Sequence, residues 1–239
     1  MKILISGTGR MGCAVRDAIA EYPGAEISAM IDENSLDVLS GGKLADVIID
    51  FSHHSMLPVL LEHSRRTETA IVVGTTGIDD ELMDRLRAKG GFAPTLYSSN
   101  YSLGIAVMKH LLPGIKAVLG DQFDIEVCET HHNKKVDAPS GTAKSLIEAL
   151  DPEGEYKLLY GRQGECGART KKEIGVHSLR GGTVAGEHTV SFFGTDEVLE
   201  VTHRAFDRRI FAKGAVTAAI KLADKPRGFY TLDDLLFEN

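Results

Sequence analysis

The sequence predicts an α/β protein, in which a Rossmann-like, doubly wound parallel sheet is accompanied by a second α+β domain with a mixed or antiparallel sheet. Short apolar runs alternate with helical patterns in the first part of the chain, as they do in folds built on parallel strands. A glycine-rich turn joins the first run to the first helix. Later runs alternate between apolar and polar residues, which indicates strands with one exposed face.

Five short, largely apolar runs are expected to form the buried strands of the parallel sheet. They cover residues 3–6, 27–31, 47–51, 70–74 and 95–97. After the first run, Met11, Val15 and Ile19 recur at helical spacing and predict one apolar helix face. A strand followed by a helix, repeated, favours right-handed crossovers with helices on both faces of the sheet.

The pattern changes after Asn100. Helices are expected at 103–119 and 141–150, and strands at 123–130, 174–179, 183–193 and 198–204. The segment 151–172 is rich in glycine and charge and is expected to be a mobile loop. A helix at 209–222 and the tail at 230–237 are expected to return to the first domain.

Composition and charge narrow the classes of function. Of the 239 residues, 43% are hydrophobic, which suffices for one large or two modest domains. The net charge of -7 disfavours a nucleic-acid or anionic-membrane partner, since both need a clustered positive field. No apolar run is expected to be long enough for a signal peptide or a membrane span. Cys13, Cys128 and Cys166 show no CxxC spacing, so we expect no disulfides or zinc site and a cytoplasmic location.

The first candidate site is the glycine-rich turn GTGRMG at residues 7–12. This pattern between a strand and a helix is typical of dinucleotide-binding domains, because the glycines let the pyrophosphate approach the N–H groups of the helix N-terminus. Asp32 ends the second predicted strand, where a carboxylate can bind the ribose hydroxyls. The alternative is that the glycines form only a tight turn and that Asp32 only solubilises a strand end.

Two further predicted strands end in residues suited to ligand contact, DFS at 50–52 and GTTG at 74–77. The carboxyl ends of parallel strands line the ligand crevice of a doubly wound sheet. An ordinary glycine turn is the alternative for 74–77. His53 and His54 follow with no third ligand nearby, so we expect them to be surface residues rather than metal ligands.

The densest group of reactive residues is ETHHNKKVDAPSGTA at 129–143. Ser140 is suited to cap the following helix, whose first amides at Gly141 and Thr142 would attract a carboxylate. Lys135 and His132 can supply charge for a second carboxylate, and a histidine can donate a proton near neutral pH.

Two other interpretations of this segment remain open. The histidines and lysines can form a solvated surface cluster without a ligand. A metal site that includes Cys128 is disfavoured, because His131 and His132 are neighbours on a predicted strand and point to opposite faces. We therefore expect no bound metal.

The segment 129–143 resembles the signature of the dihydrodipicolinate reductases, and the resemblance extends over nearly the whole chain. Further matching segments are GTGRMG at 7–12, DVIIDFS at 46–52, VVGTTG at 72–77, SSNYSLG at 98–104, EIGVHSLRGGTVAGEHTVSF at 173–192 and HRAFDRRIFAKGAV at 203–216. Agreement over this length is improbable by chance.

The resemblance implies an enzyme that reduces 4-hydroxy-tetrahydrodipicolinate to tetrahydrodipicolinate, with loss of water, in lysine and diaminopimelate biosynthesis. It implies that His131 is the proton donor or acceptor and that Lys135 is a second proton donor. The expected substrate-binding residues are His132, Ser140, Gly141 and Thr142. Besides Asp32, the expected contacts of NADH or NADPH are Gly7, Thr8, Gly9, Arg10, Met11, Gly12, Gly74, Thr75, Thr76, Ser98, Ser99, Asn100 and Tyr101.

The resemblance also implies an organisation into domains and subunits. Residues 1–102 and 213–239 are expected to bind the dinucleotide, and residues 103–212 to bind the substrate. Relatives are homotetramers joined through the sheet of the second domain, so we expect the same assembly here, with a small cyclic dicarboxylate as the other partner.

Two features depart from the family pattern. Only 13 residues separate Asp32 from Asp46, where longer members carry an extra segment, and the glycine turn is one residue shorter than in many relatives.

Two other functions compete with the leading one. An amino-acid dehydrogenase would share the glycine turn but would not need the residues between Lys135 and Thr142. A regulatory module that binds NAD without turnover would not need Lys135.

The residues near the second predicted strand bear on the choice of cofactor. Asp32 can accept hydrogen bonds from both ribose hydroxyls, and its charge, with that of Glu33, would repel a 2′-phosphate. Arg10 in the glycine turn has the opposite effect, because its positive charge can bind a 2′-phosphate. We therefore expect NADH to be preferred and NADPH to be used as well.

Overall fold

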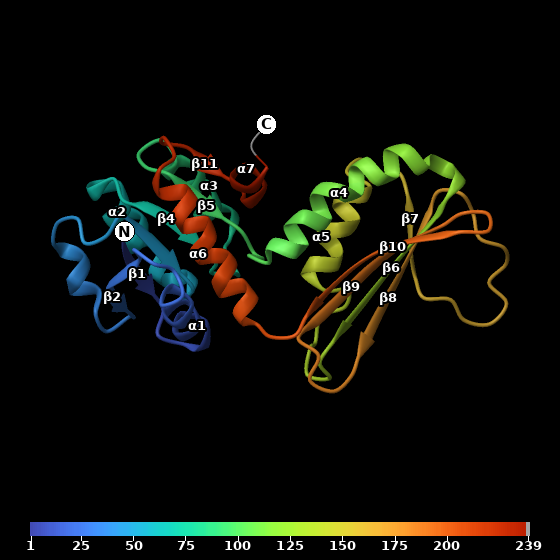
Figure 1. Cartoon of the computed structure of the whole chain (residues 1–239), viewed down its shortest axis with the longest axis horizontal. Helices are drawn as coiled ribbons and strands as arrows, with labels where there is room; N and C mark the ends of the chain where they lie inside the picture. Colours follow the sequence, from blue (N-terminus) through green and yellow to red (C-terminus); the bar gives the residue numbers. More distant parts are fainter. Residues whose placement is uncertain (238–239) are drawn as a thin grey trace. The chain divides into compact units, whose positions relative to one another are not determined.

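In the computed structural model, which describes residues 1–237, the chain forms two compact units (Figure 1). The first unit comprises Met1–Leu103 and the chain from Arg209 onward. The second unit comprises Gly104–Arg208. The chain thus leaves the first unit once and returns to it through one helix.

The first unit contains a six-stranded sheet with the order β11-β5-β4-β3-β1-β2, in which all neighbours are parallel. The predicted Rossmann-like sheet is therefore confirmed. Its strands are β1 (Lys2–Ser6), β2 (Glu26–Ile31), β3 (Val47–Asp50), β4 (Ala70–Val73), β5 (Thr95–Tyr97) and β11 (Phe229–Tyr230). Because β2 and β3 lie on opposite sides of β1, the direction of winding switches between β1 and β3, where such sheets bind ligands.

Helices cover both faces of this sheet (Figure 1). Helices α1 and α6 pack together, and α6 lies against β3 and β4. On the other face, Leu4, Ile48 and Ile71 are neighbours across β1, β3 and β4 and belong to one core with the leucines of α2 and α3. The helices are α1 (Arg10–Ile19), α2 (Leu57–Thr67), α3 (Asp80–Lys89), α6 (Arg209–Ala223) and α7 (Leu232–Leu236), with short 3-10 turns η1 (Leu36–Ser40) and η2 (His54–Met56).

Helix α3 was not predicted, although its N-terminus carries a sequence signal. Asp79 is its N-cap, and the side chain accepts a hydrogen bond from the amide of Leu82 at 2.8 Å. Aspartate followed by acidic residues in the first turn is a common start of a helix. The apolar face of α3 is narrow, with Leu82 and Leu86 buried, so the helical periodicity is weak.

The second unit contains a mixed five-stranded sheet with the order β10-β9-β6-β8-β7. Strands β6, β8 and β7 are parallel, whereas β9 is antiparallel to both β6 and β10. Its elements are α4 (Leu103–Leu119), η3 (Gly120–Gln122), β6 (Asp124–His131), α5 (Gly141–Leu150), β7 (Lys157–Tyr160), β8 (Glu173–Arg180), β9 (Gly186–Phe193) and β10 (Val198–Ala205). The predicted mixed sheet is confirmed.

Helices α4 and α5 cover one face of the second sheet (Figure 1). Leu112 of α4 and Leu146 of α5 pack in one core with Val127, Val176 and Val190 of three adjacent strands. Side chains alternate along each strand, so the next residues face away from this core.

The opposite face of this sheet is covered by no helix within residues 1–237. It carries Cys128 of β6, His177 of β8, Thr189 of β9 and Thr202 of β10, which the strand register aligns. The hydroxyls of Thr189 and Thr202 lie 3.0 Å apart. We refer to these four residues and their strands as the open face of the second sheet.

The prediction of a mobile loop at 151–172 is wrong for part of the segment. Strand β7 lies inside it and pairs with β8. Arg162 forms ion pairs with Glu126 at 2.9 Å and Glu173 at 2.7 Å, and Arg169 forms another with Glu126 at 3.3 Å. Paired charges therefore attach the segment to the strands, which a composition rich in glycine and charge cannot reveal.

The expectation that no segment is long enough for a membrane span is also wrong. Residues Leu103–Gln122, which form α4 and η3, are long and apolar enough by length and composition. A single such helix is weak evidence, because core helices can meet the same criterion. Here Met108 and Leu112 of this helix lie in the core of the second unit.

Candidate active site

The glycine turn after β1 is the best defined of the predicted cofactor contacts. Gly7 has a φ of +110°, and a Cβ there would lie 2.5 Å from the carbonyl oxygen of Phe51. A Cβ at Gly12 would lie 1.8 Å from the carbonyl oxygen of Gly7, whereas a Cβ at Gly9 would meet nothing within 4 Å. Two glycines are therefore required by the packing of the backbone itself, and the third faces open space.

The turn leads directly into α1. Gly9 is the N-cap and offers no side-chain hydrogen bond to the first amides of the helix. Thr8 and Arg10 are exposed, and Met11 is half-buried. An uncapped helix N-terminus beside a glycine turn can receive a phosphate, because its amides and the helix dipole favour an anion.

Asp32 directly follows β2 and lies beside the glycine turn. The hydroxyl of Thr8 donates to its carboxylate at 3.3 Å. The amide of Asn34 donates at 3.0 Å and the hydroxyl of Ser35 at 3.2 Å. These contacts hold the carboxylate at the position where a dinucleotide ribose binds in folds of this class.

A buried carboxylate lies between the ends of β3 and β4. Asp50 accepts hydrogen bonds from the hydroxyls of Ser52 at 2.5 Å and Thr75 at 2.6 Å. Burial raises the pKa of Asp50, and these hydrogen bonds oppose the shift. Thr75 therefore connects the ends of β3 and β4. Of its neighbours, Gly74 is half-buried and Thr76 is exposed.

The turn after β5 contains both exposed and buried residues. The hydroxyl of Ser98 donates to the carbonyl of Asn100 at 2.7 Å, and Ser99 is exposed. Tyr101 is 1% exposed, and its hydroxyl donates to the carbonyl of Val73 at 2.8 Å. The side chain of Tyr101 thus belongs to the core, so only its backbone is suited to the expected cofactor contact.

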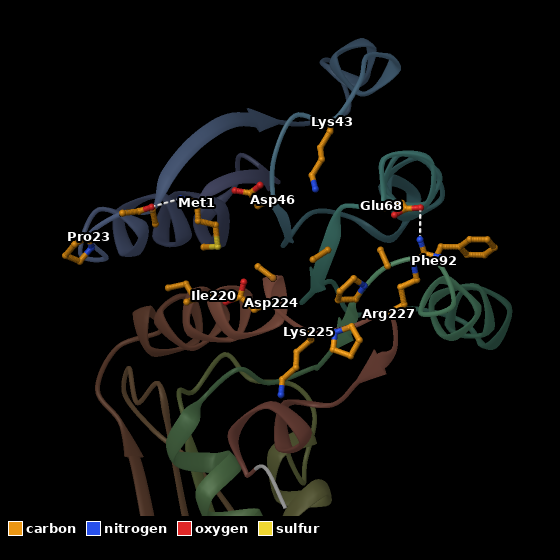
Figure 2. Close-up of a pocket in the computed structure, with 17 residues that line it drawn as sticks. Met1, Pro23, Lys43, Asp46, Glu68, Phe92, Ile220, Asp224, Lys225 and Arg227 are labelled. Atoms are coloured by element: carbon orange, nitrogen blue, oxygen red, sulfur yellow. Dashed lines mark hydrogen bonds and ion pairs between the residues drawn. The ribbon is translucent and has the colours of Figure 1, made fainter.

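A cavity of about 650 Å³ lies at the opposite, amino edge of this sheet (Figure 2). Its lining includes Met1, Asp46 and Lys225, together with Glu68 and Arg227, which form an ion pair at 2.8 Å. Parallel sheets bind dinucleotides at the carboxyl ends of their strands. We therefore assign the candidate cofactor site to the glycine turn and not to this cavity.

The candidate chemical centre of the second unit lies at the end of β6. Alternate residues of this strand are buried, and the last two of them, Glu129 and His131, are ionisable. Nδ1 of His131 lies 2.5 Å from Oε2 of Glu129. Because an ionised carboxylate can only accept a hydrogen bond, Nδ1 carries the proton and Nε2 is the nitrogen left for a ligand.

Glu129 also accepts hydrogen bonds from Arg180 and Ser140. Arg180 of β8 donates two N–H groups, at 2.8 and 2.9 Å, and the backbone amide of Ser140 donates at 3.2 Å. Burial acts to raise the pKa of Glu129, but the hydrogen bonds from Arg180 and His131 outweigh it and lower the pKa to about 2. Glu129 is therefore an anion at neutral pH and contacts both the histidine and the Ser140 turn.

A second buried histidine lies beside the first. His188 of β9 is opposite Glu129 in the sheet register, and its ring centroid is 5.1 Å from that of His131. Its Nε2 lies 3.1 Å from the hydroxyl of Ser140. Burial, reinforced by the charge of His131, lowers the pKa of His188 to about 4, so His188 is neutral at pH 7. Burial also lowers the pKa of His131, against the opposing effect of Glu129.

The loop after β6 carries Lys135 and His132. The ammonium of Lys135 donates to both carboxylate oxygens of Asp137, at 2.7 and 3.0 Å. Its charge is close enough to His131 to lower the pKa of that histidine. His132 is half-buried, with Nε2 3.2 Å from the guanidinium of Arg208.

Ser140 caps α5 as predicted. Its hydroxyl accepts a hydrogen bond from the amide of Ala143 at 3.2 Å, and the helix begins at Gly141. Gly141 is exposed and has open space where a Cβ would lie, and Thr142 is half-buried. The backbone amides at the start of α5 therefore lie at the surface of the second unit.

Potential metal ligands are dispersed in both units. Within residues 1–237, no group of three or more His, Cys, Asp or Glu side chains could hold a metal ion. The exposed rings of His53 and His54 lie on each other, with centroids 3.9 Å apart. The three cysteines are unpaired.

The sequence motifs predicted no role for Glu129, Arg180 or His188. A signal for Glu129 was available, since it precedes His131 by two residues in a strand and so lies on the same face. Arg180 and His188 had no local signal, because they reach Glu129 only through the pairing of β8 and β9 with β6.

The chain matches both domains of one protein family along nearly its full length. The N-terminal domain of dihydrodipicolinate reductase matches residues 1–101, and the C-terminal domain matches residues 104–236. A 4-hydroxy-tetrahydrodipicolinate reductase of Brachyspira hyodysenteriae is 41% identical over 99% of this chain and 100% of that protein. One of Staphylococcus saprophyticus is 42% identical over 98% of this chain and 100% of that protein.

Solved structures share the fold. A dipicolinate-bound dihydrodipicolinate reductase from Paenisporosarcina sp. TG-14 superposes with a TM-score of 0.78, at 19% identity and 99% coverage of both chains. A DAP dehydrogenase of C. glutamicum, in complex with DAP, has a TM-score of 0.56 at 12% identity, with 100% of this chain and 96% of that chain covered. At these identities, the likeness establishes the architecture alone.

Proposed function

The chain belongs to the dihydrodipicolinate reductase family, and we propose from this premise which of its residues carry out the reduction of 4-hydroxy-tetrahydrodipicolinate. It is an oxidoreductase of lysine and diaminopimelate biosynthesis. The observation that carries the residue assignment is the buried Glu129–His131 pair, whose carboxylate also accepts the amide of Ser140. A proton donor and an anion-binding turn thus share one partner.

The residues of the first unit fit a nicotinamide dinucleotide. The open space at Gly9 and the uncapped start of α1 suit the pyrophosphate, and the carboxylate of Asp32 suits the ribose hydroxyls. The exposed side chains of Thr76 and Ser99 lie in turns at the same edge of the sheet. When bound, the cofactor supplies a hydride to the substrate ring.

The residues of the second unit supply protons. Reduction of a ring double bond adds one proton together with the hydride. Loss of the hydroxyl as water delivers a second proton to the leaving oxygen and releases one from the adjacent ring carbon, so the whole reaction consumes one proton. We assign the first proton to Nε2 of His131, which is the nitrogen not bonded to Glu129. We assign the second to the ammonium of Lys135, which Asp137 orients.

The same unit offers partners for the two substrate carboxylates. One carboxylate is placed at the start of α5, on the amides of Gly141 and Thr142 beside the Ser140 cap. The other is placed near His132, whose ring contacts the guanidinium of Arg208. The dipicolinate named in the Paenisporosarcina structure is a planar dicarboxylate of the same class.

The direct test is an absorbance assay of NADH oxidation, with substrate made fresh by the preceding aldol enzyme. We expect NADH loss well above a control without the protein. No loss would contradict the proposed reaction. NADH binding without turnover would favour the alternative of a regulatory module.

Cofactor choice yields a first prediction. We expect NADH to be used more efficiently than NADPH, because Asp32 accepts from ribose hydroxyls and the exposed Glu33 adds a second negative charge. Asp32→Ser should narrow or invert the preference. Arg10→Ala should weaken NADPH more than NADH, since Arg10 is exposed and can reach a 2′-phosphate. The measurement is kcat/KM for both cofactors with the wild type and the two variants.

One result would contradict this placement of Asp32. If the wild type used NADPH at least tenfold more efficiently, about 1.4 kcal/mol in its favour, Asp32 would not face the ribose. Glu21→Gln is a suitable control, because Glu21 forms a surface ion pair with Lys213 after the end of α1, and the preference should not change.

A homotetramer is the proposed assembly, in the cytosol. The open face of the second sheet supports it, since Leu179, Phe193 and Val198 are exposed and add apolar surface to this face. Light scattering should give about four times 25.9 kDa. A mass that stayed at one chain over a wide concentration range would contradict the tetramer and leave the reaction untouched.

A further inference from the structure

The carboxylate of Glu129 is saturated with donors. Oε1 accepts from Arg180 at 2.8 Å and from the Ser140 amide at 3.2 Å, and Oε2 accepts from Arg180 at 2.9 Å and from His131 at 2.5 Å. The residue has no exposed surface. A buried carboxylate with two donors on each oxygen has a single orientation, because any rotation would leave buried polar groups unpaired.

This orientation determines the state of His131. The short contact places the proton on Nδ1 and so leaves Nε2 as the atom available to substrate. Nε2 is directed toward Gly186, where a Cβ would lie only 3.1 Å away. The neutral ring of His188 lies edge-on to the ring of His131, at a centroid distance of 5.1 Å.

Arg180 extends the network to the second proton donor. Besides its two bonds to Glu129, its guanidinium donates to the backbone carbonyl of Asp137 at 2.7 Å. The carboxylate of Asp137 in turn holds Lys135. Glu129 and Arg180 thus connect His131, Lys135 and the Ser140 turn, although neither is needed to contact the substrate.

We infer that Glu129, clamped by Arg180, is a positioning residue that holds His131 as the proton donor of the reaction and fixes it relative to the substrate-binding turn. The inference rests on the proposed function and deepens it. Arg180 is bound to Glu129, and its positive charge offsets part of the stabilisation that the negative charge of Glu129 gives to the imidazolium form of His131.

The charges around His131 predict opposite effects for the two partners. The groups that face it are Glu129 on its own strand, Arg180 on β8, His188 on β9 and Lys135 in the following loop. Glu129 raises the pKa of His131, whereas Arg180 and Lys135 lower it. His188 is neutral at pH 7 and adds no charge.

The pH profile of kcat/KM tests the inference. If protonated His131 donates, activity falls as pH rises through its pKa in the free enzyme. Glu129→Gln removes the negative charge, so the alkaline limb should move to lower pH, and kcat should fall about ten- to a hundredfold. Arg180→Gln removes the positive charge, so the same limb should move to higher pH.

Two further variants complete the design. Glu129→Asp keeps the charge and should keep an alkaline limb closer to that of the wild type than Glu129→Gln does, even if the rate falls. Glu187→Gln is the matched control, since Glu187 lies on the adjacent strand and pairs with Arg204 on the surface, and neither rate nor profile should change. Circular dichroism and NADH binding establish that each variant is folded.

The positioning role and the proposed reaction can fail independently in this experiment. Opposite shifts of the limb support the positioning role, because a general loss of structure cannot move the limb in two directions. Unchanged profiles in folded Glu129→Gln and Arg180→Gln would overturn it, even with normal wild-type turnover. If Glu129→Gln does not fold, the Arg180→Gln shift alone decides. Absence of turnover in the wild type would instead contradict the proposed function.

Discussion

His131→Ala and Lys135→Ala are each expected to slow turnover by about two to four orders of magnitude, the range for a positioned proton donor. The effect should appear mainly in kcat, because the protons are needed during the reaction more than for binding. NADH binding should be unchanged, since both residues belong to the second unit and the glycine turn belongs to the first. Steady-state absorbance assays and NADH fluorescence titration measure the two quantities.

Lys134→Ala is the matched control for this experiment. Lys134 is the exposed neighbour of Lys135. Its loss should change kcat less than twofold, as expected for a surface residue. Turnover close to that of the wild type in both His131→Ala and Lys135→Ala would contradict the assigned proton donors and favour a protein that binds NADH without catalysis.

The pattern of the sequence predicted most of the elements because their signals are local. Helices at 103–119 and 141–150 match α4 and α5, and the N-cap at Ser140 follows from one residue and the helix after it. The continuous apolar runs identify β1, β3 and β4, whose residues are buried on both faces. Periodicity and capping residues are sufficient where one segment determines its own structure.

The unpredicted features depend on contacts between distant segments. Strand β7 is short and borders β8, and its segment is attached by Arg162 to Glu126, which lies 36 residues earlier. The same holds at the candidate site, where Arg180 reaches Glu129 across 51 residues. A single sequence contains no local pattern for such pairs. The motif at 129–143 therefore predicted His131 as a candidate residue but did not predict the ion pair of Glu129 with Arg180.

The second large effect is expected in the glycine turn, where one substitution should reduce both stability and cofactor binding and another should reduce cofactor binding alone. Gly12→Ala would place a Cβ 1.8 Å from the carbonyl oxygen of Gly7, so the start of α1 must move. We expect a loss of about 1–3 kcal/mol in the free energy of unfolding, as for an overpacked core. NADH binding should be lost with it, because the amides at this helix end would no longer be in place.

Gly9→Ala should have the opposite pattern. Its φ of -75° is allowed for alanine, and its Cβ would meet nothing within 4 Å, so the free energy of unfolding should change by less than about 0.5 kcal/mol. NADH affinity should nevertheless fall about tenfold or more, since a pyrophosphate close to the backbone leaves no room for a methyl group. Urea unfolding and NADH titration of both variants test this, with the exposed Gly42→Ala as a control that should change neither quantity. Wild-type NADH affinity in Gly9→Ala would mean that the dinucleotide does not lie against this turn.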